Sequence, residues 1–183
     1  MLDLKTIQWS RLDPFDQERL LQRPVFRNPD LGNSVAGILK RVQEGGDSAL
    51  TQLTLELDGV APEMFESGIS ELDEALSNTE RDLHEALSDA ASRIREFHSA
   101  DIPRDNSVET APGLTCEVRY QALSPVGLYV PGGSAPLVST VLMLAIPAVL
   151  AGCEEIVMCS PPGKDGRVPN EILAAARLCG PAR

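Results

Sequence analysis

Residues 126–136 have the sequence VGLYVPGGSAP, in which a short apolar run meets a turn made of prolines and glycines. The run VGLYV has the composition of a strand that is covered on both faces in a parallel sheet. A second such run, EIVMC at residues 155–159, follows the helix-like segment STVLMLAIPAVLAG at residues 139–152. A further helix is expected in PNEILAAARLCG at residues 169–180. The order strand, turn, helix, strand, turn, helix predicts an α/β fold with a parallel sheet.

The turn after the first strand lies where open parallel sheets bind their ligands, beyond the carboxyl ends of the strands. Glycine lets a backbone approach a ligand closely, and proline reduces the entropy of the unfolded turn. We expect Ser139 or Thr140 to cap the next helix, whose free N–H groups favour an anion. The turn matches neither G-x-G-x-x-G nor the P-loop motif. Spacing alone therefore leaves open both a structural turn and a ligand-binding loop.

The charge of the chain changes near residue 110. Residues 1–110 hold 22 acidic and 11 basic residues, whereas residues 111–183 hold 5 of each. Apolar residues recur at helical spacing before the change, and one of these helices is expected to end at Gly46. The sequence therefore predicts two domains: an acidic helical region over residues 1–110, and an α/β nucleotide-binding region over residues 111–183.

Local signals predict further element boundaries. Asp13 followed by Pro14 is typical of a helix start, and the S-x-x-E motif at residues 77–80 matches a capping box before a long helix. Residues 103–113 are expected to form a connector. Apolar and polar side chains alternate in LTCEVRYQ, residues 114–121, which predicts a strand with one face in water.

Composition excludes several classes of partner. The net charge of −11 argues against a nucleic-acid partner, because binding to phosphates requires clustered Lys and Arg. The longest apolar run, residues 141–153, is too short to cross a bilayer, so no membrane partner is expected. The first residues, MLDLKTIQWS, lack the basic and apolar segments of a secretory signal. We therefore expect a cytoplasmic protein.

The cysteines and histidines predict no metal site. The four cysteines show no C-x-x-C spacing and are expected to be reduced thiols of the core. His84 and His98 are 14 positions apart on one expected helix, about 21 Å along its axis. They cannot share one metal ion, so both are interpreted as surface residues.

Residues 124–162, SPVGLYVPGGSAPLVSTVLMLAIPAVLAGCEEIVMCSPP, resemble the signature region of the histidinol dehydrogenase family. AARLCG continues the likeness, and EGGDSAL, FHSA and VETAPGLTCEV resemble earlier segments of that family. The resemblance implies a homodimeric, zinc-requiring, cytoplasmic enzyme of histidine biosynthesis. Such an enzyme uses two NAD molecules in sequence to oxidise L-histidinol through the aldehyde to L-histidine.

The resemblance also assigns residues. Tyr129 matches the cofactor-contacting tyrosine of the family, and Pro131 and Pro161 resemble further lining of the same adenine-nucleotide site. The family's zinc ligands, histidinol contacts and general base lie beyond Arg183. The resemblance thus implies an amino-terminal fragment without catalytic or metal-binding residues, inactive alone, whose Rossmann-like parallel sheet is incomplete.

Two alternatives stay open at this point. The chain could be a self-contained module that binds a nucleotide or another protein, or it could be a truncated product without activity. The fragment interpretation carries one physical expectation. A strand edge and part of one sheet face should be exposed to water and favour homo-oligomers.

Overall fold

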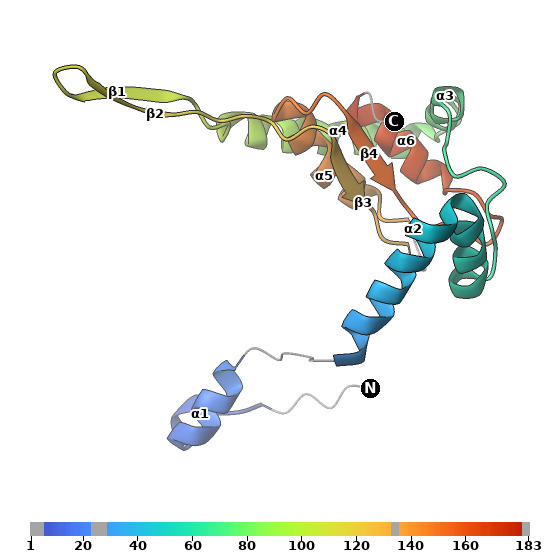
Figure 1. Ribbon diagram of the computed structural model, residues 1–183, viewed down its shortest axis with the longest axis horizontal. Helices are drawn as coiled ribbons and strands as arrows, with labels where there is room; N and C mark the ends of the chain where they lie inside the picture. The colour runs from blue at the N-terminus through green and yellow to red at the C-terminus, as the bar shows by residue number, and fades with distance from the viewer. Residues whose placement is uncertain (1–5, 23–28, 133–135, 181–183) are drawn as a thin grey trace. The chain divides into compact units, whose positions relative to one another are not determined.

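The computed structural model describes residues 6–22, 29–132 and 136–180 (Figure 1). The chain divides into two compact units, Met1–Gly46 and Asp47–Arg183. The first unit contains the short helix η1 (Trp9–Arg11), helix α1 (Pro14–Leu21) and the first part of helix α2 (Pro29–Asp58). The domain boundary expected near residue 110 stays a prediction.

Helix starts and stops in the first unit follow the predicted signals. The carboxylate of Asp13 accepts a hydrogen bond of 2.8 Å from the backbone N–H of Asp16, and Pro14 is the first residue of α1. Within α2 the backbone of Gly46 leaves the helical region, with φ 54° and ψ −141°. Glycine adopts this left-handed φ without a steric penalty. The predicted stop at Gly46 is therefore confirmed as a break between two helical segments.

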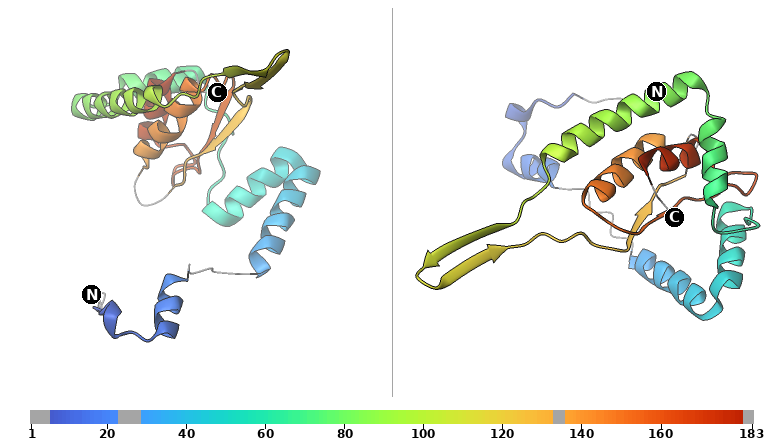
Figure 2. Two further views of the ribbon diagram at one scale, coloured as in Figure 1. Left: turned by 90° about the vertical axis from the view of Figure 1, so that its left-hand side faces the viewer. Right: turned by 90° about the horizontal axis from the view of Figure 1, so that it is seen from above.

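The second unit contains the remaining helices and strands (Figure 2). In chain order they are α3 (Ile69–Ser77), α4 (Arg81–Ala100), β1 (Asn106–Ala111), β2 (Leu114–Val118), β3 (Val126–Tyr129), α5 (Val138–Leu150), β4 (Ile156–Cys159) and α6 (Asn170–Cys179). No helix in the described parts of the chain is long and apolar enough to cross a membrane.

The predicted capping box is wrong. Ser77 is the last residue of α3, and its hydroxyl donates to the carbonyl of Glu74 at 2.9 Å. Glu80 is the N-cap residue of α4, but its side chain makes no capping hydrogen bond. The motif falls on a junction between two helices because the preceding residues form α3, a helix that was not predicted.

The expected connector at residues 103–113 is also wrong. β1 lies within it and pairs with β2 in an antiparallel hairpin, with Asn106 opposite Val118. The turn uses Gly113, whose φ is 77° and whose N–H donates to the Glu109 carboxylate at 2.8 Å. All residues of both strands are exposed, so the expected strand with a single wet face is wet on both. The alternating pattern in residues 114–121 therefore indicated a strand correctly but did not indicate a buried face.

The parallel sheet predicted from VGLYV and EIVMC is confirmed. β3 and β4 pair in parallel, with Val126 opposite Ile156 and Tyr129 opposite Cys159. Helix α5 connects the two strands and α6 follows the second, which is the predicted order of elements.

The described residues cover only one face of this sheet, as the fragment interpretation expected, although the composition of both strands is typical of two covered faces. Val126, Leu128, Ile156 and Met158 are buried or half-buried, whereas the residues between them are exposed. Figure 2 shows α4, α5 and α6 on the same side of the strands. Both β–α connections of the unit place their helices on one side, and nothing in the described residues covers the other.

The core of the second unit consists of two clusters that share α6. The larger joins Val130, α4, α5 and one face of α6, and includes the fully buried Leu142 and Ile146. The smaller joins Leu72 and Ala75 of α3 to Leu173 and Ala174 of α6. Small alanine side chains on α6 let α3 and α5 approach it from different sides.

The four cysteines are free, as expected, but they are not all in the core. Cys179 is buried, Cys153 is half-buried, and Cys116 and Cys159 are exposed. Burial raises the pKa of the Cys179 thiol to about 11, and the positive charge of Arg95 partly opposes this.

Replacing Ile146 should test the larger cluster. Ile146→Ala removes a side chain with no exposed surface and leaves a cavity, so the free energy of unfolding should fall by about 3 kcal/mol. Met143→Ala on the same helix is the control, because Met143 is 61% exposed. Urea unfolding followed by circular dichroism measures both. Equal losses for the two variants would contradict this core.

Cys179 should make stability depend on alkaline pH. Its thiol keeps its proton up to about pH 11 in the folded chain but loses it near the ordinary value of 9.0 when unfolded. Between these values the unfolded state binds fewer protons, so stability should fall as pH rises. Urea unfolding near pH 8 and pH 10 should show a smaller decline for Cys179→Ala than for the wild-type chain. An equal decline in both would mean that the thiol does not contribute.

Candidate functional site at the carboxyl edge of the sheet

The carboxyl ends of β3 and β4 meet at one edge because the strands are parallel. Just beyond this edge, Val130 has no exposed surface and anchors the end of β3 in the core. Its N–H donates to the carbonyl of Cys159 at 2.9 Å, which among the described residues is the last backbone hydrogen bond between the two segments on this side. The position of the edge is therefore fixed by a buried side chain.

Pro161 ends the hydrogen-bond ladder. In the observed register, the carbonyl of Val130 would next accept from the backbone nitrogen of residue 161. Proline has no N–H, so this hydrogen bond cannot form. The segments that follow β3 and β4 therefore stop pairing at this point, where the resemblance implies a cofactor-binding turn.

Beyond the ladder, the two turns touch at Gly132 and Pro161. A Cβ atom placed on Gly132 would lie only 2.5 Å from Cγ of Pro161 and 3.6 Å from its Cβ and Cδ. Glycine is therefore required here for space. The structure thus brings the turn of Pro131 and Gly132 against Pro161, two segments about 30 residues apart in the sequence. Residues 133–135 of the same turn lie outside the described residues.

Tyr129 lies on the uncovered face of the sheet. It is 63% exposed, and it is paired in register with Cys159, which is also exposed. Pro131 is exposed and Pro161 is half-buried. The three residues assigned from the resemblance thus lie on two adjacent strand ends, with an aromatic ring and proline rings accessible to a ligand.

The predicted helix cap is wrong. Helix α5 begins at Val138 with Leu137 as its N-cap residue, and no side chain caps it. Ser139 and Thr140 lie inside the first turn, where the N–H of Thr140 donates to the carbonyl of Leu137 at 3.0 Å. The helix starts before the first hydroxyl residue. Leu137 therefore occupies the N-cap position that was expected for Ser139 or Thr140.

Metal ligands do not gather in the part of the chain that the structure describes. Among those residues there is no group of three or more His, Cys, Asp or Glu side chains that could hold an ion. His84 and His98 both belong to α4 and are half-buried, and the ring of His98 meets Phe97 edge to face at 5.3 Å. The prediction that they bind no common metal stays a prediction.

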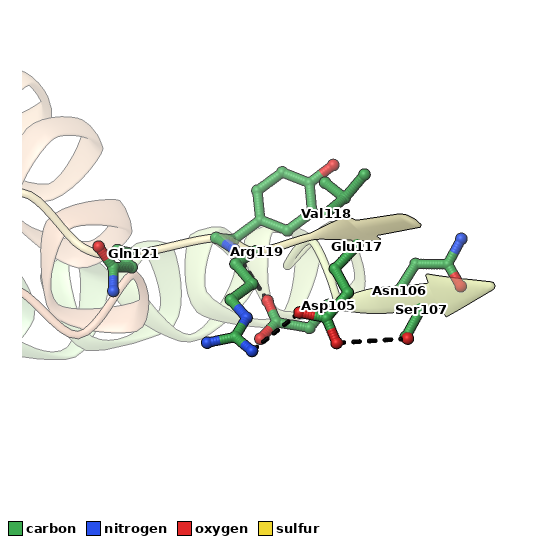
Figure 3. Close-up of a pocket in the computed structure, with 8 residues that line it drawn as sticks. Asp105, Asn106, Ser107, Glu117, Val118, Arg119 and Gln121 are labelled. Carbon is green, nitrogen blue, oxygen red and sulfur yellow. Dashed lines mark hydrogen bonds and ion pairs between the residues drawn. The ribbon is translucent and has the colours of Figure 1, made fainter. Parts of the chain in front are cut away.

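A hollow lies elsewhere, at the base of the β1–β2 hairpin (Figure 3). Its lining consists of residues 105–107 and 117–121, which are all exposed. Glu117 accepts hydrogen bonds from Ser107 at 3.4 Å and from Arg119 at 2.8 Å. The central charges thus pair with each other, and the carboxyl edge of the sheet is the stronger candidate.

Sequence reasoning alone missed the contact between Gly132 and Pro161. Each residue follows a strand closely, but spacing does not show that the two turns touch. A usable signal was the proline two residues after EIVMC, since proline cannot continue a parallel ladder.

A parallel strand–helix–strand–helix unit, with Tyr129 exposed at the carboxyl edge of its sheet, defines an α/β protein. The chain belongs to the histidinol dehydrogenase family, because the family model described as histidinol dehydrogenase matches residues 21–183.

Relatives support the same assignment. A histidinol dehydrogenase of Xylella fastidiosa (strain Temecula1 / ATCC 700964) is 45% identical over 98% of this chain and 42% of its own length. One of Vibrio parahaemolyticus is 40% identical over 97% of this chain and 40% of its own length. The crystal structure of histidinol dehydrogenase from Elizabethkingia anophelis has a TM-score of 0.84 and 36% identity, and the match covers 92% of this chain and 39% of that one. The chain thus spans about two fifths of the length of these relatives.

Proposed function

We propose that this chain is the amino-terminal part of a histidinol dehydrogenase, which oxidises L-histidinol to L-histidine with NAD. Within that enzyme, the carboxyl edge of β3 and β4 lines the adenine-nucleotide part of the NAD site. The observation that carries this proposal is the exposed Tyr129 beside a turn whose Gly132 packs on Pro161.

The residues at this edge suit a planar, partly apolar ligand. An aromatic ring binds the flat face of a base by stacking, and proline offers a rigid apolar surface. NAD, when bound, supplies the acceptor for the hydride of the alcohol carbon. Tyr129, Pro131 and Pro161 bind and orient its adenine part, with the reacting end left to other residues.

Zinc does not fit the described residues of this chain. They offer no cluster of ligands for it, so no step of the reaction is assigned to zinc here. Oxidation of an alcohol by hydride transfer also needs a base for the hydroxyl proton. We propose that both the zinc ligands and the base belong to other parts of the enzyme, as the family resemblance implies.

Replacing Tyr129 tests the cofactor site. In the full-length enzyme that contains this segment, Tyr129→Ala should raise the KM for NAD about tenfold, because stacking on a base is lost. The KM for L-histidinol should change less. Tyr120→Ala is the control, because Tyr120 is also exposed but lies at the base of the hairpin. Steady-state kinetics with each substrate varied gives the comparison, and a larger effect on L-histidinol would remove Tyr129 from the NAD site.

We also propose that the protein acts in the cytoplasm as a homo-oligomer. Large apolar side chains are exposed on several elements, among them Phe15, Phe97 and Leu123, with exposed fractions of 74%, 71% and 80%. The uncovered face of the sheet adds Val157, which is 40% exposed. Covering such groups in a self-association interface removes apolar surface from water.

Self-association can be measured directly. The purified 183-residue chain should elute as a dimer or a larger species in size-exclusion chromatography with light scattering, and it should bind a hydrophobic dye. A monomeric peak with cooperative unfolding and no dye binding would contradict this proposal.

A further inference from the structure

We propose that Gly132 and Pro161 act together as positioning residues for the adenine ring of NAD. Their contact forms a spacer that sets the distance between the turn after β3 and the turn after β4, both of which contact that ring. The spacer consists of the contact between the Gly132 backbone and the Pro161 ring. This inference rests on the proposed function, because it assigns a role within the same site.

Among the residues that the structure describes, no backbone hydrogen bond joins the two turns beyond Val130. The last rung of the ladder joins the N–H of Val130 to the carbonyl of Cys159. The next donor in the register would be the nitrogen of Pro161, which carries no hydrogen. On the opposite segment, the N–H that faces the second turn in this register is that of Gly132, and it makes no backbone hydrogen bond to the described residues of that turn. The distance between the turns beyond Val130 therefore depends on van der Waals contact.

The spacer is tight and stiff. Pro161 Cγ occupies the place next to where a Gly132 side chain would begin, at 2.5 Å from an added Cβ. The proline ring cannot rotate away, as a flexible side chain could. The backbone of Gly132 does not lie in the left-handed region, so space alone requires glycine here. Gly127 differs, because an added Cβ at that position meets nothing within 4 Å.

A methyl group at position 132 would therefore push the two turns apart. An ordinary carbon contact needs about 3.5 Å or more, so the turns would separate by roughly 1 Å. Tyr129 and Pro131 belong to one side of the spacer and Pro161 to the other. A planar ring that contacts both sides would lose contact with one of them, whereas the buried anchor at Val130 stays in place.

The test uses the full-length enzyme that contains this segment, with AMP as the probe for the adenine part of NAD. Isothermal titration calorimetry measures the dissociation constant for AMP. All variants are compared at a temperature at which circular dichroism shows them folded. Gly132→Ala should weaken AMP binding about tenfold. Gly127→Ala in β3 is the matched control, because an added Cβ there meets nothing within 4 Å, and it should bind AMP as the wild-type enzyme does.

A double-mutant cycle separates positioning from a general loss of stability. Pro161→Ala removes the ring that the added methyl group would strike. In that background, Gly132→Ala should cause no further weakening of AMP binding, so the two effects should not add. Additive losses would overturn the spacer. A lower melting temperature of Gly132→Ala without a change in AMP affinity would also overturn the spacer.

A Tyr129→Ala variant distinguishes failure of the proposed spacer from failure of the proposed cofactor site. If Tyr129→Ala abolishes AMP binding and Gly132→Ala leaves it unchanged, the cofactor site stands and the spacer is wrong. If the full-length wild-type enzyme does not bind AMP at millimolar concentration, the proposed cofactor site in this segment is wrong, and the spacer falls with it.

Discussion

The second unit depends on the close packing of α6 against two partners at once. Its Ala175 and Ala176 belong to the cluster with α4 and α5, and its Ala174 belongs to the cluster with α3. Ala174 and Ala175 have no exposed surface. Larger side chains at these positions would force α3 and α5 apart, because both helices approach the same short stretch of α6. The small residues therefore decide where the other elements lie.

This packing also explains why the site is open. Because α4, α5 and α6 all pack together, they cover the same face of β3 and β4, and Val130 is drawn fully into their core. Tyr129 precedes Val130 in an extended strand, so its side chain must lie on the opposite face. The burial of one residue thus determines the exposure of its neighbour. The same side-chain alternation that builds the core thus leaves Tyr129 exposed.

The sequence predicted elements wherever a local signal was sufficient. VGLYV and EIVMC became the parallel strands, and Asp13 and Gly46 marked a helix start and a helix break. Other predictions failed for two reasons. The S-x-x-E motif at residues 77–80 was misread because the adjacent helix α3 was not predicted. The pairing of β1 and the choice of the sheet face that stays uncovered depend on tertiary contacts, with β2 in the first case and among the helices in the second. The contact of Gly132 with Pro161 is likewise set by tertiary structure.

The charge difference between the two parts of the chain has a structural counterpart at α3. Glu71 accepts a hydrogen bond of 3.0 Å from Arg167, and Asp73 accepts one from Arg177 of α6. The hydrogen bond and the charge of Glu71 raise the pKa of Arg167. In each pair one side chain is more than half exposed and its partner about one third exposed, and such ion pairs stabilise proteins little. The apolar contacts of Leu72 and Ala75 therefore hold α3 on α6, and the two ion pairs add contacts between carboxylates of the acidic part and arginines of the second part.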